Sequence, residues 1–527
     1  MKKIINPILK GFNPDPSIIR VENDYYIATS TFQWYPGVQI HHSRDLVNWK
    51  LVTRPLNRLT QLDMRGNPDS LGVWAPCLSY YNGTYYLVYS DVKNIKGGYM
   101  DVYNYLVTTQ DILGDWSEPV YLNSRGFDQS LFHDNDGRKW LVGMSCDKEK
   151  GKDWFGGIIL QEYSEQEKKL SGPVYNIFNG TEAGLTEGPH LYKCNGYYYL
   201  ITAEGGTENY HCVTLARSTS LFGPYEVAPN NPIITTKLEP TYAMQKAGHA
   251  DFVETPDGQV YMVHLCSRPM PRNGKCILGR ETSIQKMIWT KDNWLQLECG
   301  GNKPLIEVEA PELAEFIQEK EHERDDFDNE TLSIQFQTLR IPLGEDMMSL
   351  KERSGYLRLK GRESLNSLFC QSLVARRQQS FNYTASTCVE FEPDSFKQMA
   401  GLVCYYNTEN YIYLRVTHNE ILGKCLGIIQ CHNFNVSYPL KTDVSLNGIK
   451  RIYLKVTVTY DILQFYYSVD GESWTAIGPI LDAGILSDES CKESFGFTGA
   501  FVGVCCQDFS GERKYADFDY FEYIENK

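Results

Sequence analysis

Tight turns followed by segments of alternating apolar and polar residues recur through the first half of the chain. In each repeat a short polar turn, such as Asn-Gly or Asp-Gly, precedes an aromatic-rich stretch. Such turns supply the positive φ that a two-residue β-hairpin needs, and alternation is typical of a strand with one buried face. The repeats are VENDYYIATSTF from Val21, YYNGTYYLVYSD from Tyr80, HDNDGRKWLVGMS from His133, YKCNGYYYLITAEGG from Tyr192 and VETPDGQVYMVHL from Val253.

These turns recur every 54–62 residues, with centres near Asp24, Gly83, Gly137, Gly196 and Gly258. A β repeat of this length indicates a propeller, in which each blade is a four-stranded sheet. Five turns predict five blades, and we assign residues 1–318 to this domain. An unrelated array of β-strands is the competing interpretation.

The pattern changes around residues 306–328, where IEVEAPELAEFIQEKEHERDDF is charged and lacks hairpin signals. We interpret this stretch as a linker. Beyond it, RIYLKVTVTY places alternate aliphatic residues, from Ile452 to Val458, on one face, which is typical of a half-buried antiparallel strand. Two packed sheets would bury such faces, so residues 325–527 are predicted to form a β-sandwich.

Composition narrows the classes of partner. The net charge of −15 disfavours nucleic acids and anionic membranes, because their phosphates would repel the protein. Aromatic residues make up 13% of the chain, which fits both strands and the recognition of sugar rings. The 15 cysteines show no CxxC pair, and the amino terminus has no long apolar stretch. We therefore expect reduced thiols and a cytoplasmic protein, with no membrane or nucleic-acid partner.

Three acidic residues occupy equivalent positions in three of the predicted blades. Asp15 lies between two prolines in GFNPDPSIIR, Asp128 lies in RGFDQSLFHDNDG, and Glu187 lies in GLTEGPHLYKCNG. Each precedes the first strand of its blade, and a propeller gathers one loop from each blade around a central axis. Any one of them alone would be an ordinary solvated loop acid. Their matching positions predict that the three carboxylates meet at one end of one funnel.

Several motifs, in this order, strongly resemble glycoside hydrolase family 43. They are NPDPSI, ATSTFQWYPGVQIHHSRDLVNW, VWAPCLSYYNGTYYLVYS, FDQSLFHDNDGRKWLVG, TEGPHLYK and GRETSIQ. The chain looks most like the two-domain β-xylosidases of this family, and the resemblance extends to the carboxyl terminus. It implies an all-β fold, with a five-bladed β-propeller followed by a β-sandwich of the concanavalin-like or jelly-roll type, and it implies hydrolysis with inversion.

The same resemblance gives the three acids their expected roles. Asp15 matches the family's general base, Glu187 matches the general acid, and Asp128 matches a third acid that tunes the general acid and orients the substrate. Inversion needs a base that activates water on one face of the sugar and an acid on the other, roughly 6.5–9.5 Å apart. Because the acid must be protonated near neutral pH, burial and a nearby carboxylate are expected to raise the pKa of Glu187.

Four further residues match sugar-binding positions of the family. Arg280 in LGRETSIQ matches an arginine that binds sugar hydroxyls, although an ordinary salt bridge within a strand is the alternative. Phe32 and Trp74 resemble the aromatic walls of the pocket, and their alternative is the hydrophobic core. Phe509 in VCCQDFSG matches a phenylalanine that reaches from the sandwich and closes the pocket, which would restrict the enzyme to terminal sugars. A core position is its alternative.

His249 in KAGHAD resembles a histidine on the propeller axis. In some relatives this histidine contacts a metal ion, often calcium, whose other ligands are water molecules. The resemblance therefore admits a calcium ion near His249, while no cofactor is expected to be required. One histidine without clustered acids does not by itself make a metal site.

These features together predict an exo-acting glycoside hydrolase that releases D-xylose from the non-reducing ends of short β-1,4-xylo-oligosaccharides. An α-L-arabinofuranosidase, or an enzyme with both activities, is the alternative within the family, because the two sugars present similarly placed hydroxyls. A non-catalytic sugar-binding propeller and a protein-interaction propeller are alternatives of other classes. Relatives often form dimers or tetramers, so a homo-oligomer is expected.

Overall fold

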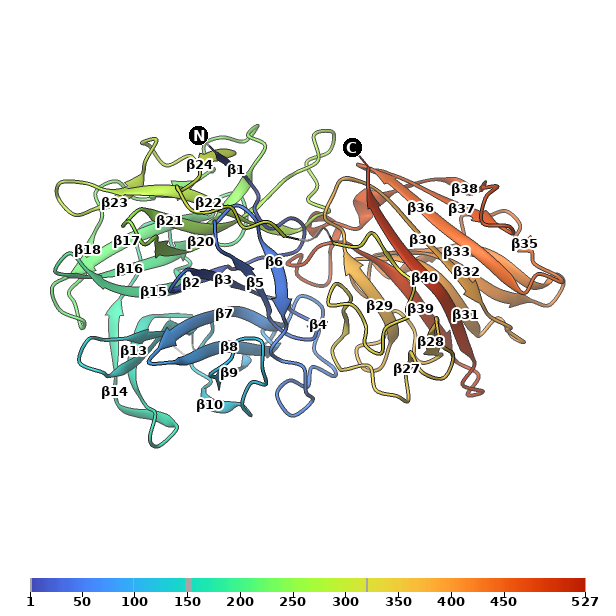
Figure 1. The fold of residues 1–527 in the computed structure, drawn as a ribbon, viewed down its shortest axis with the longest axis horizontal. Coiled ribbons are helices and arrows are strands. Elements are labelled where there is room, and N and C mark those ends of the chain that lie inside the picture. Colours follow the sequence, from blue (N-terminus) through green and yellow to red (C-terminus); the bar gives the residue numbers. More distant parts are fainter. Residues whose placement is uncertain (1, 98, 147–153, 319–320, 527) are drawn as a thin grey trace.

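The computed structural model describes residues 2–97, 99–146, 154–318 and 321–526, and it consists of two β lobes side by side (Figure 1). The first lobe is a ring of five sheets, and the second contains two larger sheets. No helix in these described ranges is long and apolar enough to cross a bilayer. The predicted fold class, a five-bladed β-propeller followed by a β-sandwich, is confirmed.

Five antiparallel sheets form the blades of the propeller. Their strands are β2 (Ser17–Val21), β3 (Asp24–Thr29), β5 (Gln39–Ser43) and β6 (Lys50–Thr53); β7 (Gly72–Tyr81), β8 (Thr84–Asn94), β9 (Asp101–Thr109) and β10 (Val120–Asn123); β11 (Ser130–His133), β12 (Lys139–Cys146), β13 (Phe155–Ser164) and β14 (Lys169–Phe178); β15 (Glu187–Cys194), β16 (Tyr197–Glu204), β17 (Cys212–Ser218), β18 (Glu226–Val227) and β19 (Ile234–Thr235); and β20 (Gln245–Glu254), β21 (Val260–Ser267), β22 (Arg280–Trp289) and β23 (Leu295–Leu297). Each predicted turn joins the first two strands of a blade, and the first of these turns is Glu22–Asn23.

The first strand of each blade is its inner strand. Strands β2, β7, β11, β15 and β20 contact one another in sequence, and β20 contacts β2 again, so the ring is closed. Residues at the amino-terminal ends of these strands line one hollow, and residues at their carboxyl ends line another. The inner strands therefore run in the same direction, and the loops that enter them lie together at one end of the ring.

Hydrogen bonds across the seam between the last blade and the first hold the ring closed. The carboxylate of Asp251 in β20 accepts hydrogen bonds from Ile18 N at 2.8 Å and Ser17 Oγ at 3.0 Å, both in β2. Near the amino terminus, β1 (Lys3–Ile5) pairs with β24 (Glu307–Glu309). The chain thus ties its first segment to the segment that leaves the last blade.

The second lobe is a sandwich of two antiparallel sheets. One contains β25 (Arg324–Asp325), β27 (Met348–Ser349), β28 (Leu357–Lys360), β30 (Asn382–Glu390), β36 (Arg451–Thr459), β37 (Ile462–Ser468), β38 (Thr475–Asp482) and β40 (Tyr515–Glu525). The other contains β29 (Ser372–Arg377), β31 (Gln398–Tyr405), β32 (Tyr411–Asn419), β33 (Gly423–His432), β34 (Asn435–Ser437), β35 (Val444–Ser445) and β39 (Phe501–Asp508). The 3-10 helices η1 (Ala483–Ile485) and η2 (Asp488–Ser490) lie between β38 and β39.

The core of the sandwich lies between its sheets. In β36 the predicted apolar face, from Ile452 to Val458, is buried in a cluster that also takes residues from the opposite sheet, such as Leu402 and Leu414. The residues between them on β36 are half-buried on the other face of the sheet. The alternation of this strand therefore predicted its two faces correctly.

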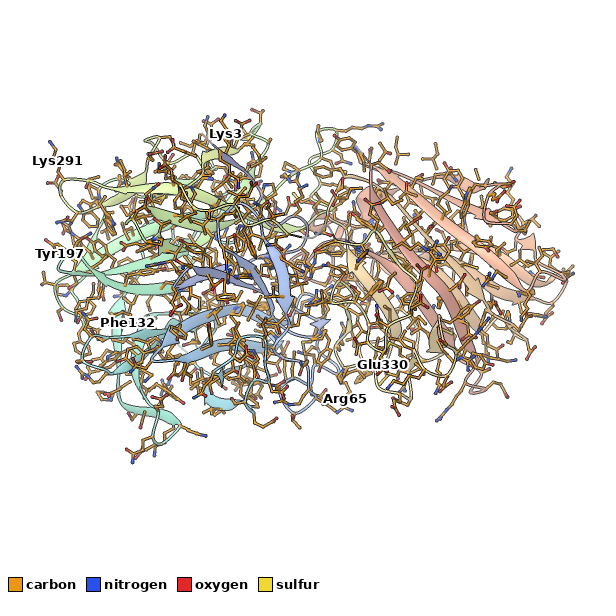
Figure 2. All side chains as sticks on the ribbon, in the orientation of Figure 1. Lys3, Arg65, Phe132, Tyr197, Lys291 and Glu330 are labelled. Carbon is orange, nitrogen blue, oxygen red and sulfur yellow. The ribbon has the colours of Figure 1, made fainter. Side chains whose placement is uncertain are left out.

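The two lobes pack closely, and side chains fill the junction between them (Figure 2). The short strand β4 (Trp34–Tyr35) of the first lobe pairs with β26 (Thr338–Leu339), and the ring of Trp34 stacks on Phe501 with centroids 3.5 Å apart. The predicted end of the propeller domain at residue 318 lies after β24, and the predicted start of the sandwich at residue 325 lies within β25. Both domain limits stay predictions.

A buried ion pair also joins the lobes. Arg340 is 0% exposed, and its Nη2 lies 2.7 Å from Asp69 Oδ1 in the propeller. The other oxygen of Asp69 accepts a hydrogen bond from Thr408 N at 2.9 Å. Both carboxylate oxygens of Asp69 therefore bind groups of the sandwich.

We expect Asp69→Ala to destabilise the protein by about 3–5 kcal/mol, because it leaves the guanidinium of Arg340 buried without its partner. Thermal unfolding of the full chain measures the effect as a lower Tm. Asp63→Ala is the matched control, since Asp63 pairs with Arg65 on the same loop but at the surface, and it should leave Tm nearly unchanged. Equal Tm values for both variants would show that the Asp69–Arg340 pair does not stabilise the junction.

Candidate active site

A hollow of about 350 Å³ lies at the end of the propeller where the inner strands begin. Each blade supplies a residue close to the start of its inner strand, and the sandwich closes one side. The lining residues are Asp15, Phe32, Trp74, Ile95, Met100, Phe127, Asp128, Trp154, Leu185, Glu187, Gly206, Thr207, His249, Arg280, Phe495 and Phe497. The structure therefore brings the three predicted acids together in one cavity of the size that small ligands occupy.

Asp15 is 5% exposed and is held by groups from three sides. Its Oδ1 lies 3.1 Å from Arg280 Nη1, and its Oδ2 accepts a hydrogen bond of 2.6 Å from Ser30 Oγ. The preceding backbone is fixed to β22, because Asn13 N donates to Arg280 O at 2.8 Å. The carboxylate is thus fixed in orientation while each oxygen keeps a further lone pair for a ligand.

The backbone at several site residues adopts the left-handed conformation, which non-glycine residues seldom adopt. The φ angles are 53° at Asp15, 56° at Asp128, 47° at His249 and 51° at Phe32. Proline favours extended backbone with negative φ at the residue before it, so the positive φ of Asp15, which precedes Pro16, goes against this preference. Tertiary hydrogen bonds around the loop therefore fix Asp15 together with its flanking prolines.

Asp128 shortly precedes β11 and Glu187 begins β15, the inner strands of neighbouring blades, and the two residues lie next to each other. Asp128 Oδ2 accepts a hydrogen bond of 3.1 Å from the backbone N–H of Gly188, the residue after Glu187. Burial, and then the negative charge of Asp15, raise the pKa of Glu187 to about 7. Burial, followed by the charges of Glu187 and Asp15, raises the pKa of Asp128 well above its usual range. Burial and the charge of Asp15 thus favour the protonated forms of Glu187 and Asp128.

Arg280 lies at the centre of the polar side of the hollow. Besides Asp15, its guanidinium donates a hydrogen bond of 3.1 Å to Phe497 O in the sandwich. It also lies over the rings of Phe32 and Phe497, 5.1 and 5.2 Å from their centroids. Arg280 does form a salt bridge, and its partner is Asp15 of the first blade, whereas the adjacent Glu281 pairs with Arg268.

Aromatic side chains form the apolar part of the lining. The ring of Trp74 contacts that of Phe127 edge-on, with centroids 5.2 Å apart. Its centroid lies 6.0 Å from that of Phe32 and 5.9 Å from that of Phe497. Phe32 and Trp74 line the hollow as predicted, and they also belong to a buried cluster, so the cavity and core interpretations both apply to them. Such ring faces can cover the C–H faces of a sugar.

Phe509 does not line the hollow, and the lid is formed by Phe495 and Phe497 instead. Strand β39 begins at Phe501 against the propeller and ends at Asp508, which pairs with Gln398 at the far end of the sheet. Phe509 follows this far end and is 43% exposed. Eight strand residues span about 26 Å. The loop before β39, rather than the loop after it, therefore reaches the propeller.

The lid loop is fixed to the propeller at several points. Ser70 Oγ donates to Phe495 O at 2.5 Å and accepts from Phe497 N at 3.2 Å. Gly279, with φ of 69°, approaches so closely that a Cβ there would lie 1.8 Å from Thr498 O. A glycine is needed at this position, because a side chain would push the lid off the propeller.

His249 lies beside the acids on the inner strand of the last blade. Its Nδ1 is 3.6 Å from Asp15 Oδ1, and a Cβ at Gly188 would lie 2.9 Å from its Nε2. Burial lowers the pKa of His249 to about 4, so the ring is neutral near pH 7. Among the described residues no group of three or more His, Cys, Asp or Glu side chains is arranged to bind a metal ion. The chain's own donors therefore do not fit a dedicated calcium site, and a calcium ion near His249 stays a prediction.

Sequence reasoning missed several residues of this hollow. Phe127 directly precedes Asp128, so its place beside an acid was a usable signal. Trp154, Leu185 and Thr207 lie in loops without a repeated pattern, and nothing in their local sequence marks them. Phe495 and Phe497 come from the other lobe, and their role depends on how the lobes dock.

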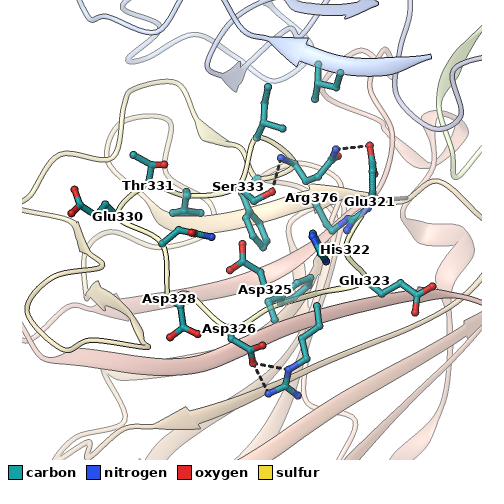
Figure 3. A pocket seen from close by; sticks show the side chains of 18 of the residues that line it. Glu321, His322, Glu323, Asp325, Asp326, Asp328, Glu330, Thr331, Ser333 and Arg376 are labelled. Atoms are coloured by element: carbon teal, nitrogen blue, oxygen red, sulfur yellow. Dashed lines mark hydrogen bonds and ion pairs between the residues drawn. The ribbon is translucent and has the colours of Figure 1, made fainter. Parts of the chain in front are cut away.

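A larger cavity of about 780 Å³ lies along residues 321–336, between β6 and Arg376 (Figure 3). Its wall is rich in acidic side chains, including Glu321, Asp325 and Asp328. Asp326 is paired with Arg324 at 2.7 Å. This cavity contains neither the predicted acids nor the aromatic wall, so the smaller hollow in the propeller is the candidate active site.

Comparison with known proteins assigns both lobes. Residues 4–295 match "Glycosyl hydrolases family 43", and residues 324–524 match "Beta xylosidase C-terminal Concanavalin A-like domain". The chain is 52% identical to a "Beta-xylosidase" of Bacillus subtilis (strain 168) over 99% of this chain and 100% of that protein. It is 50% identical to "Xylosidase/arabinosidase 43B" of Humicola insolens, over 99% and 98% of the two chains.

A solved structure agrees with this assignment. The crystal structure of a xylan beta-1,4-xylosidase from Bacillus halodurans C-125 superposes with a TM-score of 0.97 at 56% identity, covering 99% of this chain and 100% of that chain. Similarity of this extent includes the propeller, the sandwich and their junction. The chain therefore belongs to glycosyl hydrolases family 43 and is a two-domain glycoside hydrolase.

Proposed function

We propose that this glycoside hydrolase is an inverting β-xylosidase that removes D-xylose from the non-reducing ends of short β-1,4-xylo-oligosaccharides. The observation that carries the proposal is the meeting of Asp15, Asp128 and Glu187 in one hollow, with the pKa of Glu187 raised to about 7. Full-length similarity to proteins named as xylosidases supports the choice of sugar.

Asp15 is the general base in this mechanism. Its carboxylate takes a proton from a water molecule, and the water oxygen attacks the anomeric carbon on the face opposite the leaving group. Ser30 and Arg280 hold the two carboxylate oxygens, so the attacking water meets a base of fixed orientation. Fixed geometry of this kind reduces the entropy lost on reaching the transition state.

Glu187 is the general acid. Its carboxyl group keeps a proton near neutral pH because burial and the charge of Asp15 disfavour ionisation. As the glycosidic C–O bond breaks, this proton passes to the leaving oxygen, and one water is consumed for each bond cleaved. Asp128, whose pKa is also raised, adds a second protonated carboxyl that can donate a hydrogen bond to the substrate or to Glu187.

The lid explains the proposed exo action. Phe495 and Phe497 of the sandwich close one side of the hollow, and Arg280 links its polar side to the same loop. A chain of sugars cannot pass through a site closed in this way, so only a terminal residue enters. Action on short, imported substrates in the cytoplasm and a homo-oligomeric state stay predictions.

An α-L-arabinofuranosidase activity is the second candidate. It is favoured by the Humicola insolens relative, whose name includes both xylosidase and arabinosidase. The apolar wall of rings, which gives few directional contacts, could accept either sugar ring in the same hollow.

Asp15→Asn and Glu187→Gln are each expected to lower kcat on xylobiose by roughly 10²–10⁴-fold, because each removes one proton-transfer group while keeping its shape. Steady-state kinetics measures the loss, and thermal unfolding checks that both variants fold. A near-wild-type rate in either folded variant would refute its assigned role. Sugar binding without turnover in the unmodified enzyme would favour a non-catalytic propeller.

The activity should fall as pH rises through about 7. Protonated Glu187 is the active form, so kcat/KM for xylobiose is expected to decrease tenfold per pH unit above its pKa. In Glu187→Gln the residual activity should lack this basic limb. A basic limb that persists unchanged in the variant would assign it to another group.

Product analysis separates the sugar classes and tests inversion. NMR during hydrolysis of 4-nitrophenyl β-D-xylopyranoside should show α-xylose as the first-formed anomer. Parallel assays on 4-nitrophenyl α-L-arabinofuranoside and on β-1,3- and β-1,4-linked xylobiose should show preference for the β-1,4-xyloside. First-formed β-xylose would contradict inversion, and faster release of arabinose would favour the second candidate.

A further inference from the structure

Ser30 is a fully buried serine that directly follows β3 and contacts the Asp15 loop twice. Its backbone N–H donates a hydrogen bond of 3.1 Å to Pro14 O. Its Oγ lies 2.6 Å from Asp15 Oδ2 and 2.8 Å from the backbone nitrogen of Ala75 in β7. One side chain thus joins the loop of the first blade to the inner strand of the second.

The direction of these hydrogen bonds follows from the chemistry of the groups. The amide N–H of Ala75 can only donate, so Ser30 Oγ accepts from it. A hydroxyl has one hydrogen to donate, and an ionised carboxylate can only accept. The Ser30 hydroxyl therefore donates to Asp15, and 2.6 Å is typical of a hydrogen bond from O–H to a charged carboxylate. The amide upstream polarises the hydroxyl and strengthens this bond.

We propose that Ser30 is the positioning residue for the catalytic base, holding the Asp15 carboxylate in the orientation that receives the attacking water. This inference rests on the proposed function, in which Asp15 is the base. Ser30 holds Oδ2 while Arg280 holds Oδ1, so the plane of the carboxylate cannot turn without breaking one of the two contacts. The remaining lone pairs stay available for water.

Asp15 has four charged or titratable neighbours, and Ser30 differs from them because it carries no charge. Arg280 and His249 contact Oδ1, while Glu187 and Asp128, from the fourth and third blades, are coupled to Asp15 electrostatically. Ser30 is a neutral donor to Oδ2. Removing its hydroxyl therefore changes the stability of the charged carboxylate without adding or removing a charge in the hollow.

Ser17 provides a matched control within the same blade. Its Oγ accepts from Leu78 N in β7 at 3.1 Å and donates to the buried carboxylate of Asp251 at 3.0 Å. This arrangement repeats that of Ser30: in both, a backbone amide of the second blade donates to a serine of the first blade, and the serine donates to a buried acid. Asp251 faces the hollow at the other end of the ring, away from the lid. Ser17→Ala should therefore reproduce the structural cost without touching the base.

The test compares Ser30→Ala, Ser30→Thr, Ser30→Val and Ser17→Ala on 4-nitrophenyl β-D-xylopyranoside. This substrate has a good leaving group, so its hydrolysis depends less on the acid and reports on the base. We expect kcat to fall roughly tenfold to a hundredfold in Ser30→Ala and Ser30→Val, with KM changed little. The acidic limb of their pH–rate profiles should move to higher pH by about half to one unit.

Ser30→Thr keeps the hydroxyl and has nearly the shape of valine, so its acidic limb should stay at the wild-type pH. Ser17→Ala should lower Tm about as much as Ser30→Ala and leave the acidic limb in place. If Ser30→Thr and Ser30→Val have the same kcat and the same pH profile, the positioning role is wrong. It is also wrong if Ser17→Ala moves the acidic limb as far as Ser30→Ala does. Activity retained by Asp15→Asn would instead overturn the proposed function, so the two failures are distinguishable.

Discussion

Three carboxyl groups buried in one small hollow are the constraint on which this site depends. Like charges buried close together cannot all form at once, so the groups must divide protons among themselves. Arg280 and Ser30 contact only Asp15 among the three, so both of its carboxylate oxygens accept hydrogen bonds from fixed donors. Its charge in turn raises the pKa of Glu187 and Asp128. The positions of the donors Arg280 and Ser30 beside Asp15 thus explain why Asp15 suits the role of base and Glu187 that of acid.

The sandwich is part of this electrostatic arrangement and not a separate module. Arg280 donates to Phe497 O, and the same loop is held by Ser70 of the propeller. The lid excludes water from one side of the hollow, which lowers the local dielectric and strengthens the coupling among the acids. Docking of the lobes, through contacts such as Asp69 with Arg340, is therefore a condition for the proton distribution in the site.

Features that depend on local sequence were predictable, and those that depend on docking were not. The blades follow from turns and alternation within short segments, and the three acids from their equal places before inner strands. The prediction that Phe509 closes the pocket was wrong because no local pattern tells which end of β39 faces the propeller. In the structure the end at Phe501 faces it, since the ring of Phe501 stacks on Trp34. Ser30 lies within one of the family motifs, but nothing in the sequence gives it a role, since a serine after a strand is ordinary until its neighbours across two blades are known.

The location of Asp15 explains why its surroundings are so strongly fixed. It follows the segment that crosses from the last blade to the first, where Asn13 is bonded to β22 and Pro14 to Ser30. A left-handed residue costs of order 1–3 kcal/mol, and such a conformation persists only where its neighbours determine it. Loosening of the ring seam would therefore remove the contacts that hold Asp15 in this conformation. The closure that stabilises the propeller is, for this reason, also what positions the base.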